Sequence, residues 1–228
     1  VGVQAGPLLI IAGAGTGRTM TLAHRVAHLV LAGTAPERLL LLTFGRRAAR
    51  ERAGRARRVV ARALAARSGR PEGDVRLPWA GTFHAMANRL LRDYAPNLGL
   101  DPSFSVLDRG DAADLMDVVR HRLDYSATRR RFPRKDTCLA IYSRTVNSRR
   151  ALGEVLETAW PWCLDWETEL RTLFRSYAEA KLTSAALDYD DMLLYWCHLM
   201  SEPELAAAVA ARFDQVLVDE YQDTNVLQ

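Results

Sequence analysis

The chain has 228 residues, 49% of them hydrophobic and 25% charged, which is ordinary for a globular protein. No apolar run reaches the roughly 18 residues that a membrane-spanning helix needs, and the N-terminus lacks the pattern of a secretory signal. These features argue against a membrane or secreted class and favour a cytoplasmic protein. Cys138, Cys163 and Cys197 form no CxxC pair, so buried thiols are expected rather than disulfides or a zinc site.

Two segments concentrate the basic charge. Ten arginines lie between Arg46 and Arg70 against the single acid Glu51, and eight basic residues lie between Arg129 and Arg150. Such runs are candidate surfaces for a polyanion. A solvated helix face, with Glu51 paired to Arg55 one turn later, explains the first run as well. Charge alone leaves both interpretations open.

Short apolar runs predict strands, each followed by helical sequence, as in an α/β protein with a parallel sheet. The predicted strands are residues 8–12, 39–44, 79–83 and 215–219. The best-patterned helices are residues 19–31, 46–66, 83–94 and 189–200. Between residues 101 and 186 the pattern is helical with no convincing strand, and acidic residues from Asp108 to Asp117 crowd a helix start. This stretch is predicted to be a helical insertion.

A glycine-rich loop connects the first predicted strand to the first helix. Glycines allow a tight turn that brings backbone N–H groups onto phosphate oxygens, and the helix N-terminus adds its positive dipole end. Thr19 would supply a hydroxyl to Mg²⁺. A plain glycine turn before a helix is the alternative. The residues of this predicted phosphate cradle are Ala12, Gly13, Ala14, Gly15, Thr16, Gly17, Arg18 and Thr19.

An acidic pair follows the last predicted strand. Asp219 and Glu220 come directly after an apolar run, where Asp219 can hold Mg²⁺ and Glu220 can deprotonate an attacking water. Such a pair can also be only the beginning of a loop. Parallel strands would place it at the same sheet edge as the glycine loop, where nucleotides bind. The two motifs together predict a nucleotide site.

These motifs carry a family resemblance. The segments 12–19 and 219–225 resemble motifs I and II of UvrD/Rep-type superfamily 1 DNA helicases. Three further segments agree in order and spacing: residues 42–49 resemble motif Ia, 81–84 motif Ib, and 187–193 the acidic segment where the chain returns from a helical subdomain. The chain begins at Val1 and stops shortly after the second motif, so a fragment is expected.

The resemblance implies a RecA-like P-loop NTPase fold, with domain 1A in residues 1–100 and 187–228 and helical subdomain 1B in residues 101–186. It implies ATP and Mg²⁺, with Glu220 as the base, Thr19 and Asp219 on the magnesium side, and single-stranded DNA and strand junctions as partners. Stacking on bases needs no particular sequence. The residues implied to contact DNA are Phe44, Arg46, Arg47, Thr82 and His84. A core aromatic and a buried or capping histidine are the alternatives for Phe44 and His84, and His24 with His28 are expected to be structural.

The sequence departs from the family pattern at the phosphate loop. Arg18 stands where the family has a lysine, and its guanidinium is larger and forked where the site suits a compact ammonium. Gly45 and Met20 are smaller departures, and Gln4 lies too close to Gly13 to be the glutamine that reads adenine. We expect the chain alone to be a poor ATPase, because the resemblance puts an arginine finger in a second domain.

The sequence is compatible with four functions. The first is the N-terminal part of an ATP-dependent DNA helicase whose complete protein moves 3′ to 5′ and unwinds duplex. A degenerate module that grips single-stranded DNA or a partner without hydrolysis is the second, and Arg18 favours it. A helicase-nuclease shares all five motifs. A small-molecule P-loop kinase explains the glycine loop but neither Phe44 nor the segment after Asp219.

Overall fold

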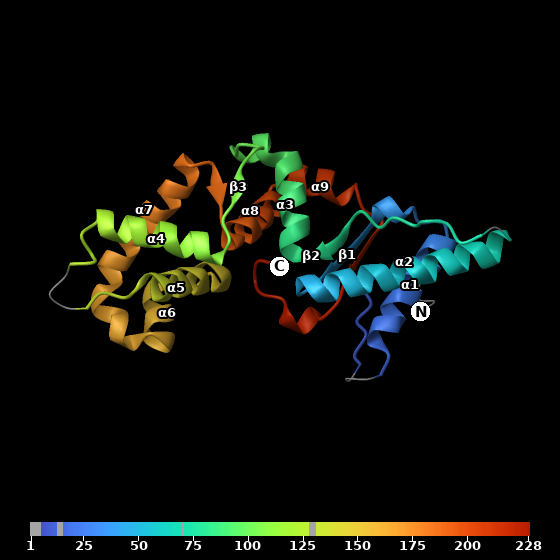
Figure 1. Ribbon diagram of the computed structural model, residues 1–228, viewed down its shortest axis with the longest axis horizontal. Helices are drawn as coiled ribbons and strands as arrows, with labels where there is room; N and C mark the ends of the chain where they lie inside the picture. The colour runs from blue at the N-terminus through green and yellow to red at the C-terminus, as the bar shows by residue number, and fades with distance from the viewer. Residues whose placement is uncertain (1–5, 13–15, 70, 128–130) are drawn as a thin grey trace. The chain divides into compact units, whose positions relative to one another are not determined.

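The computed structural model describes residues 6–12, 16–69, 71–127 and 131–228, which form two compact units (Figure 1). The first unit contains the described residues up to Met86 together with Met200–Asp223. The second contains Ala87–Leu199 and Thr224–Gln228. None of the described helices is long and apolar enough to cross a membrane.

A small parallel sheet forms the centre of the first unit. Strand β1 (Leu39–Thr43) is buried along its whole length and lies between β2 (Ala80–Thr82) and β5 (Gln215–Val218). Both neighbours run parallel to β1, with Thr43 opposite Thr82 and Leu42 opposite Val218. The residues that follow the three strands therefore meet at one edge of the sheet.

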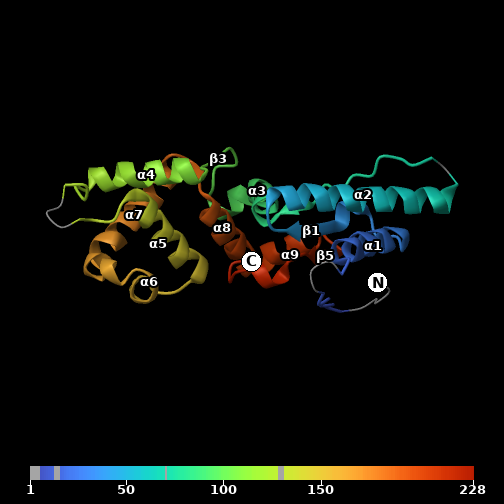
Figure 2. The ribbon, with the colours of Figure 1, turned by 60° about the horizontal axis from the view of Figure 1, so that its bottom comes forward.

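Two long helices pack together beside this sheet (Figure 2). Ala23 and Val26 of the first helix are buried in one cluster with Ala56 and Val60 of the second and Leu39 of β1. Small and β-branched side chains let the two backbones approach closely. The helical elements of this unit are α1 (Arg18–Leu31), η1 (Pro36–Arg38), α2 (Arg46–Ser68), the start of α3 (Phe83–Tyr94), α9 (Pro203–Ala210) and η4 (Tyr221–Asp223).

The second unit is mainly helical. Its core packs fully buried side chains such as Met116, Ile141, Leu156 and Leu173. A two-stranded parallel sheet joins β3 (Ser105–Val106) to β4 (Ala186–Leu187). Its helical elements are the rest of α3, η2 (Ala95–Leu98), α4 (Arg109–Arg122), α5 (Lys135–Ser148), α6 (Leu152–Ala159), η3 (Pro161–Trp166), α7 (Glu167–Thr183) and most of α8 (Tyr189–Ser201).

The structure confirms most of the predicted elements and corrects two. Three predicted strands and all four predicted helices form, with ends that differ by at most two residues. The strand predicted for residues 8–12 is wrong: these residues have no regular secondary structure, and Leu9 and Ile11 are 69% and 90% exposed. An apolar run becomes a strand only where a neighbouring strand offers hydrogen bonds, and no described strand pairs with it. The short β3–β4 pair was not predicted.

The acidic helix start agrees with expectation, and so do two of the three thiols, while Cys197 is only half-buried. Asp108 caps α4, and its carboxylate accepts hydrogen bonds from the backbone N–H groups of Gly110 and Asp111 at 2.8 and 2.9 Å. Cys138 and Cys163 are buried, and burial raises the pKa of Cys138 to about 12 and that of Cys163 to about 11. These two thiols therefore stay protonated and unreactive at neutral pH.

Candidate functional site

The first helix begins at the predicted phosphate loop. Gly17 has a φ of +84°, a conformation that glycine adopts readily, and its carbonyl accepts the N–H groups of Met20 and Thr21 at 2.8 and 3.0 Å. Arg18 is the first residue of α1, and Thr19 lies in its first turn, half-buried. Gly13, Ala14 and Gly15 lie outside the described residues. The cradle formed by residues 12–19 thus remains a prediction for the loop itself.

The acidic pair lies at the end of the parallel sheet. The Asp219 N–H donates to the Leu42 carbonyl at 2.9 Å, which extends the β1–β5 pairing one residue beyond the strand. Asp219 is only 5% exposed, and its Oδ1 accepts the Glu220 N–H at 2.9 Å. Glu220 itself has a φ of +54°, in the left-handed region that non-glycine residues rarely adopt. Backbone strain at a strand end is typical of functional sites.

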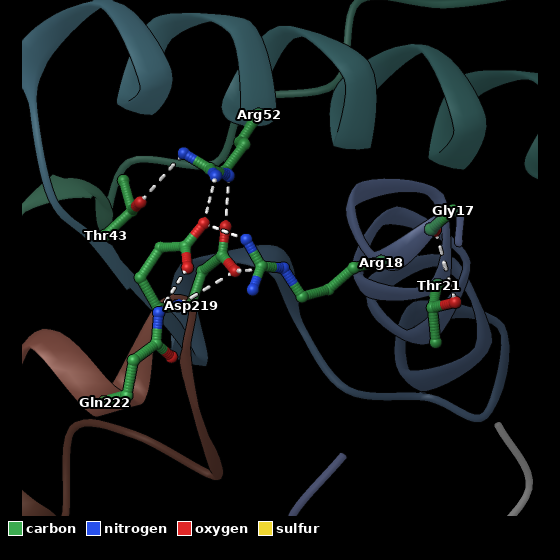
Figure 3. Close-up of polar contacts among 8 residues, drawn as sticks. Gly17, Arg18, Thr21, Thr43, Arg52, Asp219 and Gln222 are labelled. Carbon is green, nitrogen blue, oxygen red and sulfur yellow. Dashed lines mark hydrogen bonds and ion pairs between the residues drawn. The ribbon is translucent and has the colours of Figure 1, made fainter. Parts of the chain in front are cut away.

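Two arginines meet this acidic pair (Figure 3). Arg18 forms an ion pair with Glu220, and its Nε lies 3.7 Å from Asp219 Oδ1. Arg52 of α2 forms an ion pair with Asp219, and its Nη2 donates to Glu220 Oε1 at 3.2 Å. The structure thus brings together Arg18 and Glu220, which are 202 positions apart in the chain. Two positive charges balance two negative charges at one edge of the sheet.

Sequence reasoning counted Arg52 only as one of many arginines. Its side chain is 14% exposed, whereas the other arginines that flank it on α2, such as Arg50 and Arg55, are exposed. A signal was available: Arg52 lies three residues after buried Ala49 and four before buried Ala56, so it occupies the apolar stripe of α2. An arginine on a buried stripe needs acidic partners, and in the structure these come from far along the chain.

The residues predicted to contact DNA follow two neighbouring strands. Phe44 comes after β1, is half-buried, and packs against Phe83 with ring centroids 5.1 Å apart. Thr82 Oγ1 accepts the Ala85 N–H at 3.2 Å and so caps the start of α3, while His84 is half-buried in its first turn. Arg46 and Arg47 are exposed at the start of α2. Their shared position at the ends of β1 and β2 is a structural fact; their contact with DNA stays a prediction.

The arginine-rich face of α2 is only partly neutralised. Glu51 accepts a hydrogen bond from Arg47 Nε at 2.9 Å, so its partner is Arg47 rather than the predicted Arg55. That hydrogen bond lowers the pKa of Glu51, and the charges of Arg52 and Arg55 lower it further. The other exposed arginines of this helix are Arg46, Arg50, Arg55, Arg57, Arg58, Arg62 and Arg67, and Arg62 pairs with Glu72 at 3.6 Å. Their surface keeps a strong positive charge.

The two histidines of α1 line an apolar groove. His24 and His28 lie with Met20 and Val59 around a volume of about 550 Å³ between α1 and α2. Among the described residues, no group of three or more histidine, cysteine or acidic side chains could hold a metal ion. The structural role expected for both histidines stays a prediction.

The acidic segment of the second unit is buried in a polar network. Asp188 and Asp191 cap α8 reciprocally: the Asp191 N–H donates to Asp188 at 2.8 Å and the Asp188 N–H to Asp191 at 3.1 Å. Lys181 of α7 bonds both carboxylates, at 2.7 and 2.6 Å. Asp190 instead accepts from Asn147 at 2.5 Å, and Asn147 in turn accepts from Asn225 at 2.9 Å. This segment therefore organises the second unit.

Carboxylates at the end of a parallel strand, beside a helix that follows a glycine turn, are typical of nucleotide-binding α/β proteins. The chain belongs to the UvrD/REP helicase family, because the family model for the UvrD/REP helicase N-terminal domain matches residues 1–228. The resemblance inferred from the motifs is thereby confirmed.

Curated relatives agree with this family. The chain is 35% identical over 225 residues to the ATP-dependent DNA helicase PcrA of Leuconostoc citreum. It is 31% identical to the proteins of the same name from Bacillus subtilis and Staphylococcus aureus. Each match covers 98% of this chain but only 28% of the relative. The chain therefore spans little more than a quarter of the length of these relatives.

Proposed function

We propose that this chain is the ATP-binding N-terminal part of an ATP-dependent DNA helicase. In this proposal the first unit is a RecA-like domain, the helical residues of the second are an inserted subdomain, and the complete protein moves 3′ to 5′ on single-stranded DNA and opens duplex at strand junctions. The observation that supports this proposal most directly is the ion pairing of Arg18, at the start of α1, with Asp219 and Glu220 at the end of β5. Membership of the UvrD/REP family supports the same reading.

The oxygen donors at this edge suit Mg²⁺. Carboxylate and hydroxyl oxygens are the ligands that this ion prefers, and Asp219 and Thr19 provide one of each. Bound there with ATP, Mg²⁺ would neutralise charge on the phosphate oxygens. Asp219 Oδ1 already accepts the Glu220 N–H at 2.9 Å, which fixes its carboxylate at the strand end. In this proposal Asp219 and Thr19 would hold the ion.

Glu220 is proposed to act as the base. Its Oε2 accepts a hydrogen bond from Gln222 at 2.6 Å, and its Oε1 is held by Arg18 and Arg52. Once released from the two arginines, a carboxylate at this position can accept a proton from a water that attacks the terminal phosphate. Arg18 and the backbone of residues 12–19 are proposed to face the phosphates, and the residues from Phe44 to His84 at the strand ends are proposed to face the DNA.

Glu220→Gln tests this assignment in the complete protein. The amide keeps the size of the side chain but cannot accept the proton, so ATP binding should persist while turnover falls by at least about 10²-fold. Binding is measured with a fluorescent nucleotide and turnover by phosphate release. Turnover that survives the substitution would remove Glu220 from the proposed role.

A second function is favoured by one contact. The ion pair between Arg18 and Glu220 holds the cation of the phosphate loop on the proposed base. If ATP does not displace it, the protein would grip single-stranded DNA or a partner without hydrolysis. Replacing Arg18 by lysine separates this binding module from an active helicase.

A further inference from the structure

Arg52 connects three chain segments at the sheet edge. Its Nη1 donates to Thr43 Oγ1 at 3.2 Å, its Nη2 donates to Glu220 Oε1 at 3.2 Å, and it forms an ion pair with Asp219 (Figure 3). Thr43 and Asp219 are both buried. A planar guanidinium with five donors can hold acceptors on several segments at once, which a lysine cannot do with the same geometry.

Both carboxylate oxygens of Glu220 have partners in the structure. Arg18 and Arg52 both contact Oε1, and Gln222 donates to Oε2 at 2.6 Å. A base must turn toward its water, so this set of contacts restrains the residue that is proposed to act. Arg52 is the contact that comes from α2.

Helix α2 also carries the arginines proposed to meet DNA. It begins at Arg46, directly after the turn at Gly45, whose φ is +75°, and Thr43 ends the strand before that turn. Arg52 lies six residues into α2, about 9 Å along the axis. Because a helix moves as a rigid rod over that length, a ligand that shifts its first turn also shifts Arg52 relative to Glu220.

We propose that Arg52 is a positioning residue that couples nucleic-acid binding at the start of α2 to the orientation of Glu220. The inference rests on the proposed function and concerns the same site. With the first turn of α2 empty, Arg52 keeps Glu220 restrained; with single-stranded DNA bound there, the Arg52–Glu220 contact loosens and Glu220 is released. DNA and nucleotide should then change each other's affinity by the same factor, because such coupling is reciprocal.

The test measures that factor in the complete protein. The affinity for a fluorescent dT oligonucleotide is determined with and without a non-hydrolysable ATP analogue, and the ratio of the two affinities is the coupling factor. The unsubstituted protein should give about fivefold or more, and Arg52→Gln should lower the factor to below about twofold. In the Arg52→Gln variant the ratio of DNA-stimulated to DNA-free turnover should also be smaller than in the unsubstituted protein.

Two further variants keep the test decisive. Thr43→Val removes the acceptor at the end of β1 and leaves every charge in place, so it should also reduce the coupling factor, and it decides the matter if Arg52→Gln does not fold. Arg120→Gln is the matched control, because Arg120 is a 15% exposed helical arginine of the second unit paired with Asp117 at 2.8 Å. Its coupling factor should equal that of the unsubstituted protein.

The outcomes separate this inference from the function on which it rests. An unsubstituted protein that binds neither the nucleotide nor the oligonucleotide contradicts the proposed function. A protein that binds both but has a coupling factor of one, or an Arg52→Gln variant with unchanged coupling, overturns only the role of Arg52. Equal losses in DNA-free and DNA-stimulated turnover, with unchanged coupling, would show that Arg52 is merely structural.

Discussion

Arg18 is the residue on which the activity of this site depends most. Its guanidinium contacts both carboxylates from the first position of α1. A forked guanidinium bonds a carboxylate strongly, whereas a lysine ammonium is a compact point charge that can leave one partner for another more easily. The identity of this one side chain therefore determines whether the cation stays on Glu220 or meets the phosphates.

Arg18→Lys should reveal which of the two proposed functions holds. In the complete protein, with single-stranded DNA present, a disabled binding module should gain turnover of about 10-fold or more over a near-zero background, since one lost ion pair changes a barrier by roughly 1 to 2 kcal/mol. Phosphate release is the measurement. If the unsubstituted protein instead turns over ATP as fast as the Arg18→Lys variant, that result contradicts the binding-module function and agrees with the helicase proposal.

At the level of elements, the junction of α7 and α8 depends on a buried charge cluster. Lys181 lies between Asp188 and Asp191 and over the rings of Tyr142 and Tyr177. Burial raises the pKa of Asp191 to about 6, the charge of Asp188 adds to the shift, and Lys181 opposes it. Burial would lower the pKa of Lys181, but Tyr142 and the two aspartates raise it overall. The lysine thus stays charged and holds the first turn of α8 against α7.

Lys181→Met should destabilise the protein by about 3 to 5 kcal/mol at pH 8, because two buried carboxylates lose their cation. The loss should be smaller at pH 5. The folded-state pKa of Asp191 is raised, so its contribution to stability is present below its ordinary pKa and is lost as the pH rises through about 6. Without Lys181 the pKa of Asp191 rises further. At pH 5 this carboxyl is then protonated, so it carries no negative charge that needs a cation beside it.

Urea denaturation at both pH values measures this effect. Lys135→Met is the control, because Lys135 is the chain's other lysine and its ion pair with Asp114 is exposed. That variant should change the free energy of unfolding far less. An equal loss at pH 5 and pH 8 for Lys181→Met would contradict the account of Asp191.

At the scale of the whole molecule, each unit has its own buried core. The clusters around Val26 and Val60 and around Ile141 and Leu173 contain residues of one unit each. The reactivity of the thiols indicates whether the core around Ile141 and Leu173 is closed. Cys138 and Cys163 are fully buried in this core, and Cys197 is half-buried elsewhere in the same unit.

Thiol labelling should therefore proceed in two stages. In native buffer at pH 8 a thiol reagent should modify Cys197 first, while Cys138 and Cys163 should react only at the rate at which the core opens, because their raised pKa values leave almost no thiolate. Mass spectrometry of the labelled peptides gives the order. Early labelling of Cys138 would show that the core around Ile141 is not closed in solution.

The sequence by itself determined the family and the main strands and helices, and it predicted that the start of α1 and the end of β5 lie at one edge of the sheet. These follow from local patterns: periodicity for α1 and α2, short apolar runs for β1 and β5, and residue type for Gly17 and Asp219. Such patterns reflect backbone geometry and burial within a few neighbouring residues, so they can be read directly.

Only the tertiary structure decided which distant residues meet. Among the described residues it gave 8–12 no strand partner, paired β3 with β4, and placed Arg52 on Asp219 and Glu220. The ion pairs of Lys181 with Asp188 and Asp191 likewise form through space, within a core that several helices enclose. The physical reason is that hydrogen-bond partners and buried charges are satisfied through space, and the nearest acid to Arg52 in space is more than 160 positions away in the chain.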